Sequence, residues 1–161
     1  MKQLISLFCI IFSIGMLNAQ QFPEVSLKTL DGKSINSSSI KANGKPLIIC
    51  FWKSCCTVNE KMLDALSEVY EDWKDEFGVK IYAVSVDDSR SSAKIRPLVN
   101  GKGWELDFLQ DVNSDFKRAL SVANPPYILI YNAKGELIAQ KPGFQSGYEM
   151  EIYKILKENS N

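Results

Sequence analysis

The stretch Leu47–Leu66, LIICFWKSCCTVNEKMLDAL, decides the fold of this chain. Its first part, Leu47–Trp52, is apolar without charge or alternation, as expected for a strand buried on both faces of a sheet. The second part is predicted to be helical, because apolar residues recur there at steps of three and four: Val58, Met62, Leu66, Val69 and Trp73. The sequence therefore predicts a central strand that leads directly into an amphipathic helix.

Two adjacent cysteines, Cys55 and Cys56, lie where this strand meets the helix. Thr57 and Glu60 have the spacing of a capping box, which predicts Thr57 as the N-cap. A thiol at a helix N-terminus feels the positive end of the helix dipole, which favours the thiolate. We therefore expect Cys56 to be a nucleophile whose pKa lies below that of a free cysteine.

The same stretch resembles the thioredoxin superfamily, in particular the TlpA-like redoxins of the bacterial cell envelope. That family has Phe-Trp after an apolar strand and Cys-x-x-Cys at the start of a helix. Phe51-Trp52 and Cys56 match these positions. The resemblance implies an α/β, thioredoxin-like fold, in which a central mixed sheet carries helices on both faces. It also implies thiol-disulfide chemistry that needs no cofactor.

Three residues depart from the family pattern. Cys55 stands where the family has Trp, and Asn59 stands where the second cysteine belongs, so the Cys-x-x-Cys motif is degenerate. Cys50 matches the position of a buried Asp that serves the second cysteine in dithiol thioredoxins. Because free cysteine is often a small core residue, we expect Cys50 to be buried and structural.

Pro126 matches the cis-proline that lies beside the nucleophile in this family, and an ordinary strand-entry proline is the alternative. The preceding family residue pairs its backbone with the substrate chain, but here it is Pro125, which has no N–H to donate. The resemblance assigns Cys56, Cys55 and Pro126 to the catalytic site, and it assigns Trp52, Pro125 and Asn59 to substrate binding.

The role of Cys55 is left open by the sequence. A disulfide with Cys56 would be strained, because consecutive Cα atoms lie about 3.8 Å apart and disulfides usually need about 4.4–6.8 Å. Cys55 could otherwise be a second exposed thiol beside the first. No third ligand is placed beside the pair, so no metal site is predicted.

Charged residues near the pair admit two interpretations. Lys53 and Lys61 flank the cysteines and could lower their pKa, or they could be solvated surface lysines. Asp87 and Asp88 end a predicted core strand, where α/β proteins place functional loops, and a turn or cap role is the alternative.

Composition excludes several function classes. The chain has 161 residues, enough for one domain, with 19 basic and 19 acidic residues and no Lys/Arg block. Nucleic acid is therefore not an expected partner. The chain has no His, which excludes hydrolases that rely on a His base and metal sites with His ligands.

Residues 1–19 have the pattern of a secretory signal peptide. Lys2 supplies the positive charge, Leu4–Leu17 the apolar core and Leu17-Asn18-Ala19 a small-residue cleavage site. The apolar run of about 14 residues is shorter than the roughly 20 that span a membrane, so no stable insertion is expected after cleavage. The predicted division is a signal peptide over 1–19 and a thioredoxin-like domain over 20–161, exported to the periplasm or cell envelope of a bacterium.

Apolar periodicity and turn residues predict the remaining elements. The expected strands are Val25–Leu30 at an edge, Val79–Val86 in the core, a half-exposed strand over Trp104–Phe108, and a hairpin of Tyr127–Tyr131 with Glu136–Gln140. The expected helices are Ser89–Asn100, Asn113–Leu120 and Tyr148–Lys157, and Ser34–Lys45 is expected to be a loop.

Three functions are compatible with these residues. The first is thiol-disulfide exchange through Cys56, resolved by Cys55 or by an external thiol, with protein or small-molecule thiols and disulfides as partners. The second is a binding module that has lost catalysis. The third is a one-cysteine peroxidase, against which counts Lys53 in the place where peroxiredoxins have Thr.

Overall fold

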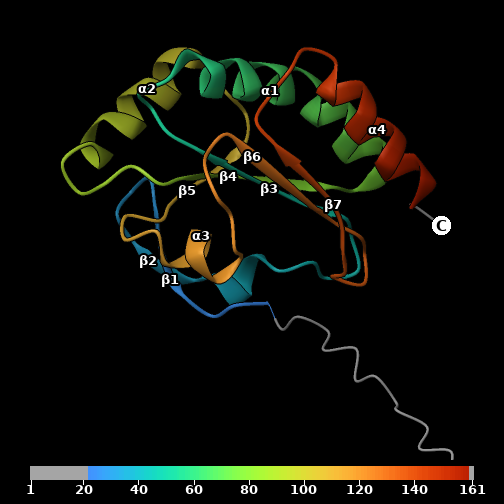
Figure 1. Cartoon of the computed structure of the whole chain (residues 1–161), viewed down its shortest axis with the longest axis horizontal. Coiled ribbons are helices and arrows are strands. Elements are labelled where there is room, and N and C mark those ends of the chain that lie inside the picture. Colours follow the sequence, from blue (N-terminus) through green and yellow to red (C-terminus); the bar gives the residue numbers. More distant parts are fainter. Residues whose placement is uncertain (1–21, 160–161) are drawn as a thin grey trace, which may run out of the picture.

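A computed structural model describes residues 22–159 of the chain. Within this range, the strands form one seven-stranded sheet, and the helices connect them or follow the last strand (Figure 1). The strands are β1 Ser26–Thr29, β2 Ser34–Asn36, β3 Leu47–Trp52, β4 Lys80–Ser85, β5 Asp107–Gln110, β6 Tyr127–Tyr131 and β7 Leu137–Pro142. The α-helices are α1 Thr57–Phe77, α2 Ile95–Lys102, α3 Asp115–Ala119 and α4 Tyr148–Glu158, with short 3₁₀ helices at η1 Ser37–Ile40 and η2 Ser92–Lys94.

The sheet has the order β2-β1-β5-β4-β3-β6-β7 and is mixed. Strands β3, β4 and β5 run parallel, and the crossovers between them pass through α1 and α2. Both crossovers step in the same direction along the sheet, so the right-handed rule places both helices on one face. Strand β6 is antiparallel to β3, which makes β3 an interior strand.

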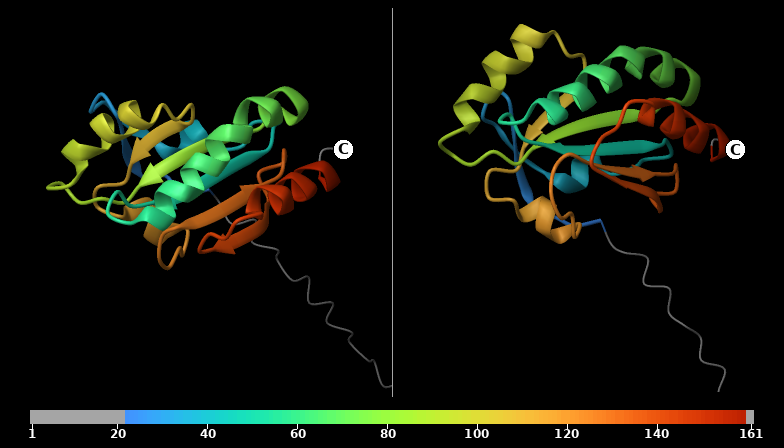
Figure 2. Two further views of the ribbon diagram at one scale, coloured as in Figure 1. Left: turned by 90° about the horizontal axis from the view of Figure 1, so that it is seen from above. Right: turned by 45° about the horizontal axis from the view of Figure 1, so that its top comes forward.

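Helices cover both faces of the sheet (Figure 2). Helices α1, α2 and α4 pack on one face, and α3 with η1 packs on the other. Strand β3 contributes alternate residues to the two cores, and all six of its side chains are at most 2% exposed. This double burial explains the continuous apolar run and confirms the predicted fold class.

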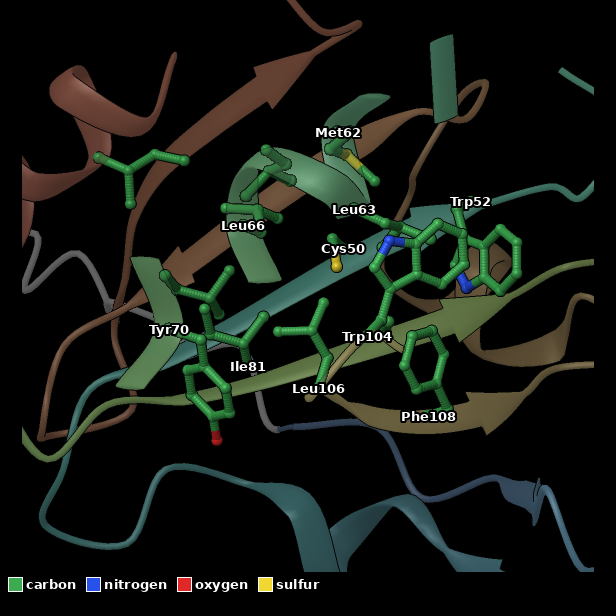
Figure 3. Close-up of a cluster of buried hydrophobic side chains, with 14 of the residues drawn as sticks. Cys50, Trp52, Met62, Leu63, Leu66, Tyr70, Ile81, Trp104, Leu106 and Phe108 are labelled. Atoms are coloured by element: carbon green, nitrogen blue, oxygen red, sulfur yellow. The ribbon is translucent and has the colours of Figure 1, made fainter. Parts of the chain in front are cut away.

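The core under α1 contains aromatic and aliphatic residues together with Cys50 (Figure 3). Trp52 packs edge-on against two further rings, with centroid distances of 5.8 Å to Trp104 and 6.0 Å to Phe108. Edge-to-face aromatic pairs of this kind are favourable beyond the apolar area that they bury. This core therefore lies directly beneath the point where β3 leads into α1.

The predicted edge strand is wrong in its position. Strand β1 lies inside the sheet between β2 and β5, and β2 is the edge strand, in a segment that was expected to be a loop. Strand β2 has only three residues and no fully buried side chain, so it carries too little apolar periodicity to be detected. Its pairing is decided by the hairpin with β1 across the turn at Gly32.

Boundaries of other elements also differ from the prediction, most clearly in α2 and β5. The helix expected over Ser89–Asn100 begins as η2 and continues as α2, with Pro97 in its first turn. Proline is tolerated there because the first N–H groups of a helix have no intrahelical acceptor. The strand expected over Trp104–Phe108 begins only at Asp107. In the part of the chain that the structure describes, no helix is both long and apolar enough to span a bilayer.

Candidate functional site

The candidate site is the loop Lys53–Cys56, between the carboxyl end of β3 and the first turn of α1. Cys56 is the N-cap, with extended backbone angles of φ −135° and ψ 123°, and its carbonyl oxygen accepts from the Asn59 N–H at 2.9 Å. The cysteine side chain makes no capping hydrogen bond. Cys56, which matches the first cysteine of the family motif, is thus the residue that immediately precedes the helix.

The predicted capping box is wrong. Thr57 is already the first helical residue, so its side chain is one position too late to act as the N-cap. Glu60 instead forms an ion pair with Lys102, with 2.8 Å between Oε2 and Nζ, and this pair ties the first turn of α1 to the end of α2. Val58 is 40% exposed and does not belong to the buried face of the helix.

The two thiols of the site are both exposed and unoxidised. Their Sγ atoms are 3.0 Å apart and share a hydrogen bond in which either sulfur could be the donor. Cysteines at adjacent positions therefore converge here, rather than pointing to opposite sides of the loop. The Cys55 sulfur is therefore close enough to attack a disulfide formed at Cys56.

The pKa of Cys56 is raised above its ordinary value, contrary to the expectation from the helix dipole. The largest cause is the hydrogen bond with the Cys55 thiol, followed by desolvation and by the charge that Cys55 acquires on ionisation. Lys53 acts in the opposite direction, and the negative charge of Asp87 adds to the increase. Two thiols in contact thus oppose the loss of the proton from Cys56.

Asp87, just beyond the end of β4, anchors the loop from the neighbouring strand. Its Oδ2 accepts from the Ser54 N–H at 3.0 Å and from the Ser85 hydroxyl at 2.7 Å, and its Oδ1 accepts from the Ser54 hydroxyl at 2.8 Å. Asp88 instead closes the next turn, where its Oδ1 accepts from the backbone N–H groups of Arg90 and Ser91. The sequence had left open whether these two aspartates belong to a functional loop or serve a turn.

Ser54 and Ser85 were missed by the sequence analysis. Serine is common in loops and at strand ends, so neither residue carries a signal by itself. Their roles follow from the parallel register, in which Trp52 pairs with Ser85 and the Val86 N–H donates to the Trp52 carbonyl at 3.0 Å. That register brings Asp87 opposite the cysteine loop.

Trp52 and Asn59 were expected to contact substrate, and the structure places both residues in the interior. Trp52 is fully buried, and its Nε1 has no hydrogen-bond partner within residues 22–159. Asn59 is 1% exposed and accepts from the Lys53 N–H at 3.3 Å. Neither side chain is exposed to a ligand in this structure, and the Asn59 bond holds the Lys53 end of the loop.

The prolines lie at the same end of the sheet as the cysteines. Phe51 pairs with Tyr127 in antiparallel register, which places Pro126 beside the end of β3. The peptide bond between Pro125 and Pro126 is cis. Pro126 is buried and its carbonyl oxygen accepts from the Gly143 N–H at 2.8 Å, whereas Pro125 is half-buried.

Cys50 is a core residue, as predicted. It is 0% exposed, and its thiol donates to the Tyr82 carbonyl oxygen at 3.5 Å. Burial raises its pKa to about 12. Cys50 therefore takes no part in chemistry at the exposed pair.

These features define a thioredoxin-like protein: a mixed sheet, a parallel β3-α1-β4 unit, and a cysteine at the start of the helix. Residues 19–141 match the AhpC/TSA family, and the chain belongs to that family. The resemblance to thioredoxin-like redoxins that was inferred from the residues is confirmed.

Similar proteins carry related names. The chain is 28% identical over 142 residues to the thioredoxin-like protein YneN of Bacillus subtilis, which covers 86% of this chain and 79% of that protein. It is 25% identical over 134 residues to the thiol-disulfide oxidoreductase ResA of Bacillus thuringiensis, which covers 83% and 75%. The solution structure of an uncharacterized thioredoxin-like protein from Porphyromonas gingivalis is 39% identical, with a TM-score of 0.76 over 88% of this chain and 92% of that one.

Proposed function

We propose that this protein exchanges thiols and disulfides through a single nucleophile, Cys56. The observation that carries the proposal is the exposed Cys56 thiol at the start of α1, with the Cys55 sulfur 3.0 Å away. An exposed sulfur at a helix N-terminus can reach a partner disulfide, and Lys53 favours the thiolate that attacks. The name thiol-disulfide oxidoreductase, borne by ResA, agrees with this chemistry.

The reaction begins when Cys56 loses its proton and its thiolate attacks one sulfur of a partner disulfide. A bond forms between Cys56 Sγ and that sulfur, the partner S–S bond breaks, and the other partner sulfur leaves as a thiolate that takes up a proton. The site then holds a mixed disulfide. No oxidant or reductant other than the partner disulfide is needed for this step.

Two routes can resolve the mixed disulfide. The Cys55 thiolate can attack Cys56 Sγ, which releases the partner as a thiol and leaves a disulfide between neighbouring residues. That ring is strained and easily reduced, because adjacent Cα atoms are closer than disulfides normally allow. Alternatively, an external thiol attacks the partner sulfur and restores free Cys56, while Cys55 stays reduced.

The surrounding residues contribute to partner binding. Pro126 lies at the strand end next to the loop, and Pro125 is half-buried and has no N–H to donate. An extended partner chain aligned there would therefore form one hydrogen bond fewer with this segment. We propose protein or small-molecule thiols and disulfides as the partners.

We further propose that the protein is exported. This proposal rests on the signal-peptide pattern of residues 1–19, which lie outside the residues that the structure describes. Residues 20–161 would then form the mature domain, in the periplasm or cell envelope, where thiols and disulfides interconvert.

The test uses the mature chain and the variants Cys55→Ser, Cys56→Ser and Cys50→Ser. Each protein is incubated with oxidised glutathione, quenched with acid and analysed by intact mass and peptide mapping. We expect Cys55→Ser to accumulate the mixed disulfide on Cys56, Cys56→Ser to react at least about tenfold more slowly, and Cys50→Ser to behave like the wild type.

Equal rates for Cys55→Ser and Cys56→Ser would overturn the choice of Cys56 as nucleophile. If no variant and no wild-type protein exchanges faster than a cysteine in a short peptide, the protein is a binding module. The buried amide of Asn59 in place of a second thiol and the raised pKa of Cys56 favour that second function. A sulfenic acid on Cys56 after mild peroxide treatment would instead identify a peroxidase.

A further inference from the structure

We propose that Asp87 is the positioning residue of the cysteine loop, holding it through Ser54 and governing the reactivity of Cys56 by its negative charge. The inference deepens the proposed function, on which it rests for its biological meaning. Its evidence is the hydrogen-bond geometry of a nearly buried carboxylate that reaches the loop from the strand next to β3.

The contacts of Asp87 are directed at the residue immediately before the cysteines. Both carboxylate oxygens bond to Ser54, one through its backbone N–H at 3.0 Å and the other through its hydroxyl at 2.8 Å. Two bonds to one residue restrict its rotation as well as its position. Since Cys55 follows Ser54 directly, holding Ser54 also restricts the position of the Cys55 backbone, from which the thiol extends.

Asp87 is itself held firmly. It is 6% exposed, its Oδ2 accepts from the Ser85 hydroxyl at 2.7 Å, and its own N–H donates to the Ser85 Oγ at 3.1 Å. Ser85 is fully buried and lies in β4, paired with the last residue of β3. The loop is therefore tied to the rigid interior of the sheet rather than to another loop.

The charge of Asp87 acts on the site as well. The charged and titratable groups that act on Cys56 are Cys55, Lys53 and Asp87, and of the two fixed charges Lys53 favours the thiolate and Asp87 opposes it. Removing the charge of Asp87 should therefore release the Cys56 proton more easily. An asparagine at this position keeps one oxygen that can accept from the Ser54 N–H and the Ser85 hydroxyl, and its amide nitrogen can donate to the Ser54 Oγ, so the charge can be removed while the loop stays anchored.

The experiment compares Asp87→Asn, Ser54→Ala and the control Asp88→Asn, all in the mature chain. Asp88 is the matched control, because it follows Asp87 directly, is exposed and bonds only to its own turn. Two readouts are measured: the pH dependence of iodoacetamide labelling at Cys56, and the affinity for phenylarsine oxide, which must bridge two nearby sulfurs. Thermal unfolding checks that each variant is folded.

We expect Asp87→Asn to label Cys56 about two- to fivefold faster at pH 7, with the labelling curve displaced to lower pH, because one opposing charge is lost. We expect Ser54→Ala to leave the midpoint pH of the labelling curve unchanged. The same variant should bind phenylarsine oxide about three- to tenfold more weakly, because the loop loses one hydrogen bond. Asp88→Asn should match the wild type in both readouts.

The inference is overturned if Asp87→Asn and Asp88→Asn give the same labelling curve, or if Ser54→Ala binds the arsenical as tightly as the wild type. Should Asp87→Asn fail to fold, Ser54→Ala still decides the positioning role, since its side chain lies at the edge of the site. Neither readout involves a partner disulfide. A failure of disulfide exchange would therefore count against the proposed function and leave this inference standing.

Discussion

Cys50 and the Cys55–Cys56 pair are the same residue type within seven positions of one another, yet they occupy opposite environments. Cys50 lies inside β3, fully buried among apolar side chains (Figure 3). Cys55 and Cys56 lie just past the end of the same strand and are exposed. The difference shows that the end of β3 separates a buried, structural thiol from two exposed thiols that are accessible for reaction.

The physical reason is the cost of placing a thiolate in an apolar interior. Burial raises the pKa of Cys50 to about 12, so this thiol stays neutral at any physiological pH. Desolvation contributes less to the raised pKa of Cys56 than its hydrogen bond with the neighbouring Cys55. The ionisation of Cys50 is thus controlled by the hydrophobic core, and that of Cys56 mainly by its neighbours Cys55, Lys53 and Asp87.

The largest expected effect is a difference in native-state labelling between the two regions. At pH 8 we expect iodoacetamide to modify Cys55 and Cys56 and to modify Cys50 at least about a thousandfold more slowly, because Cys50 has neither access nor thiolate. Peptide mass spectrometry at timed intervals measures the three rates. In a denaturant the three rates should converge, and native labelling of Cys50 within tenfold of the pair would break the comparison.

The next effect is on stability at high pH. In the unfolded chain the Cys50 thiol ionises near its ordinary pKa of 9.0, and in the folded protein near about 12. Below pH 9 the thiol is protonated in both states, so the free energy of unfolding does not depend on its ionisation. Between pH 9 and 12 the thiol ionises only in the unfolded state, which stabilises that state relative to the folded one. The free energy of unfolding should therefore fall by up to about 1.4 kcal/mol per pH unit as the pH rises from 9 towards 12.

Cys50→Ala tests this dependence. Urea unfolding at pH 8, 9, 10 and 11 should show the wild type losing about 2–3 kcal/mol relative to the variant across that range. Tyr131, whose pKa burial raises to about 12, contributes equally to both proteins and cancels. Parallel curves for the two proteins would show that Cys50 ionises in the folded state as easily as in the unfolded one.

The smallest expected effect concerns the influence of the Lys53 charge on the exposed pair. Lys53→Met removes a positive charge that favours the Cys56 thiolate, so labelling of Cys56 at pH 8 should slow by about twofold. Lys61→Met is the control, since Lys61 is an exposed residue of α1 and is not among the groups that act most strongly on Cys56. An equal change in both variants would mean that general surface charge, and not Lys53, affects the thiol.

Local pattern predicted most of the fold. The apolar run of β3, the stripe of α1 and the hairpin of β6 with β7 were identified from their own residues, because burial on a defined face leaves a periodic signature. Strand β2 and the start of β5 were missed or misplaced, since short strands are defined by hydrogen bonds to distant partners. The position of β1 inside the sheet is likewise a property of the assembled sheet.

The candidate site was only partly predictable. The sequence located Cys55 and Cys56 and the burial of Cys50, but it expected Thr57 as the N-cap and did not indicate that Asn59 is buried beneath the loop. Both features depend on where the chain turns after β3, and no single residue near that turn indicates its position.

The sequence by itself determined the fold class, the junction of strand and helix, and the presence of adjacent thiols there, because apolar periodicity and residue identity are local properties. Only the tertiary structure decided that the two sulfurs converge, that Asp87 holds their loop through Ser54, and that Cys56 keeps its proton more tightly than a free thiol. The contact of Asp87 depends on the register of β3 against β4, which forms only when the sheet assembles. The meeting of the two sulfurs, which is the largest cause of the raised pKa, depends on the path of the loop between β3 and α1, and no local sequence pattern encodes that path.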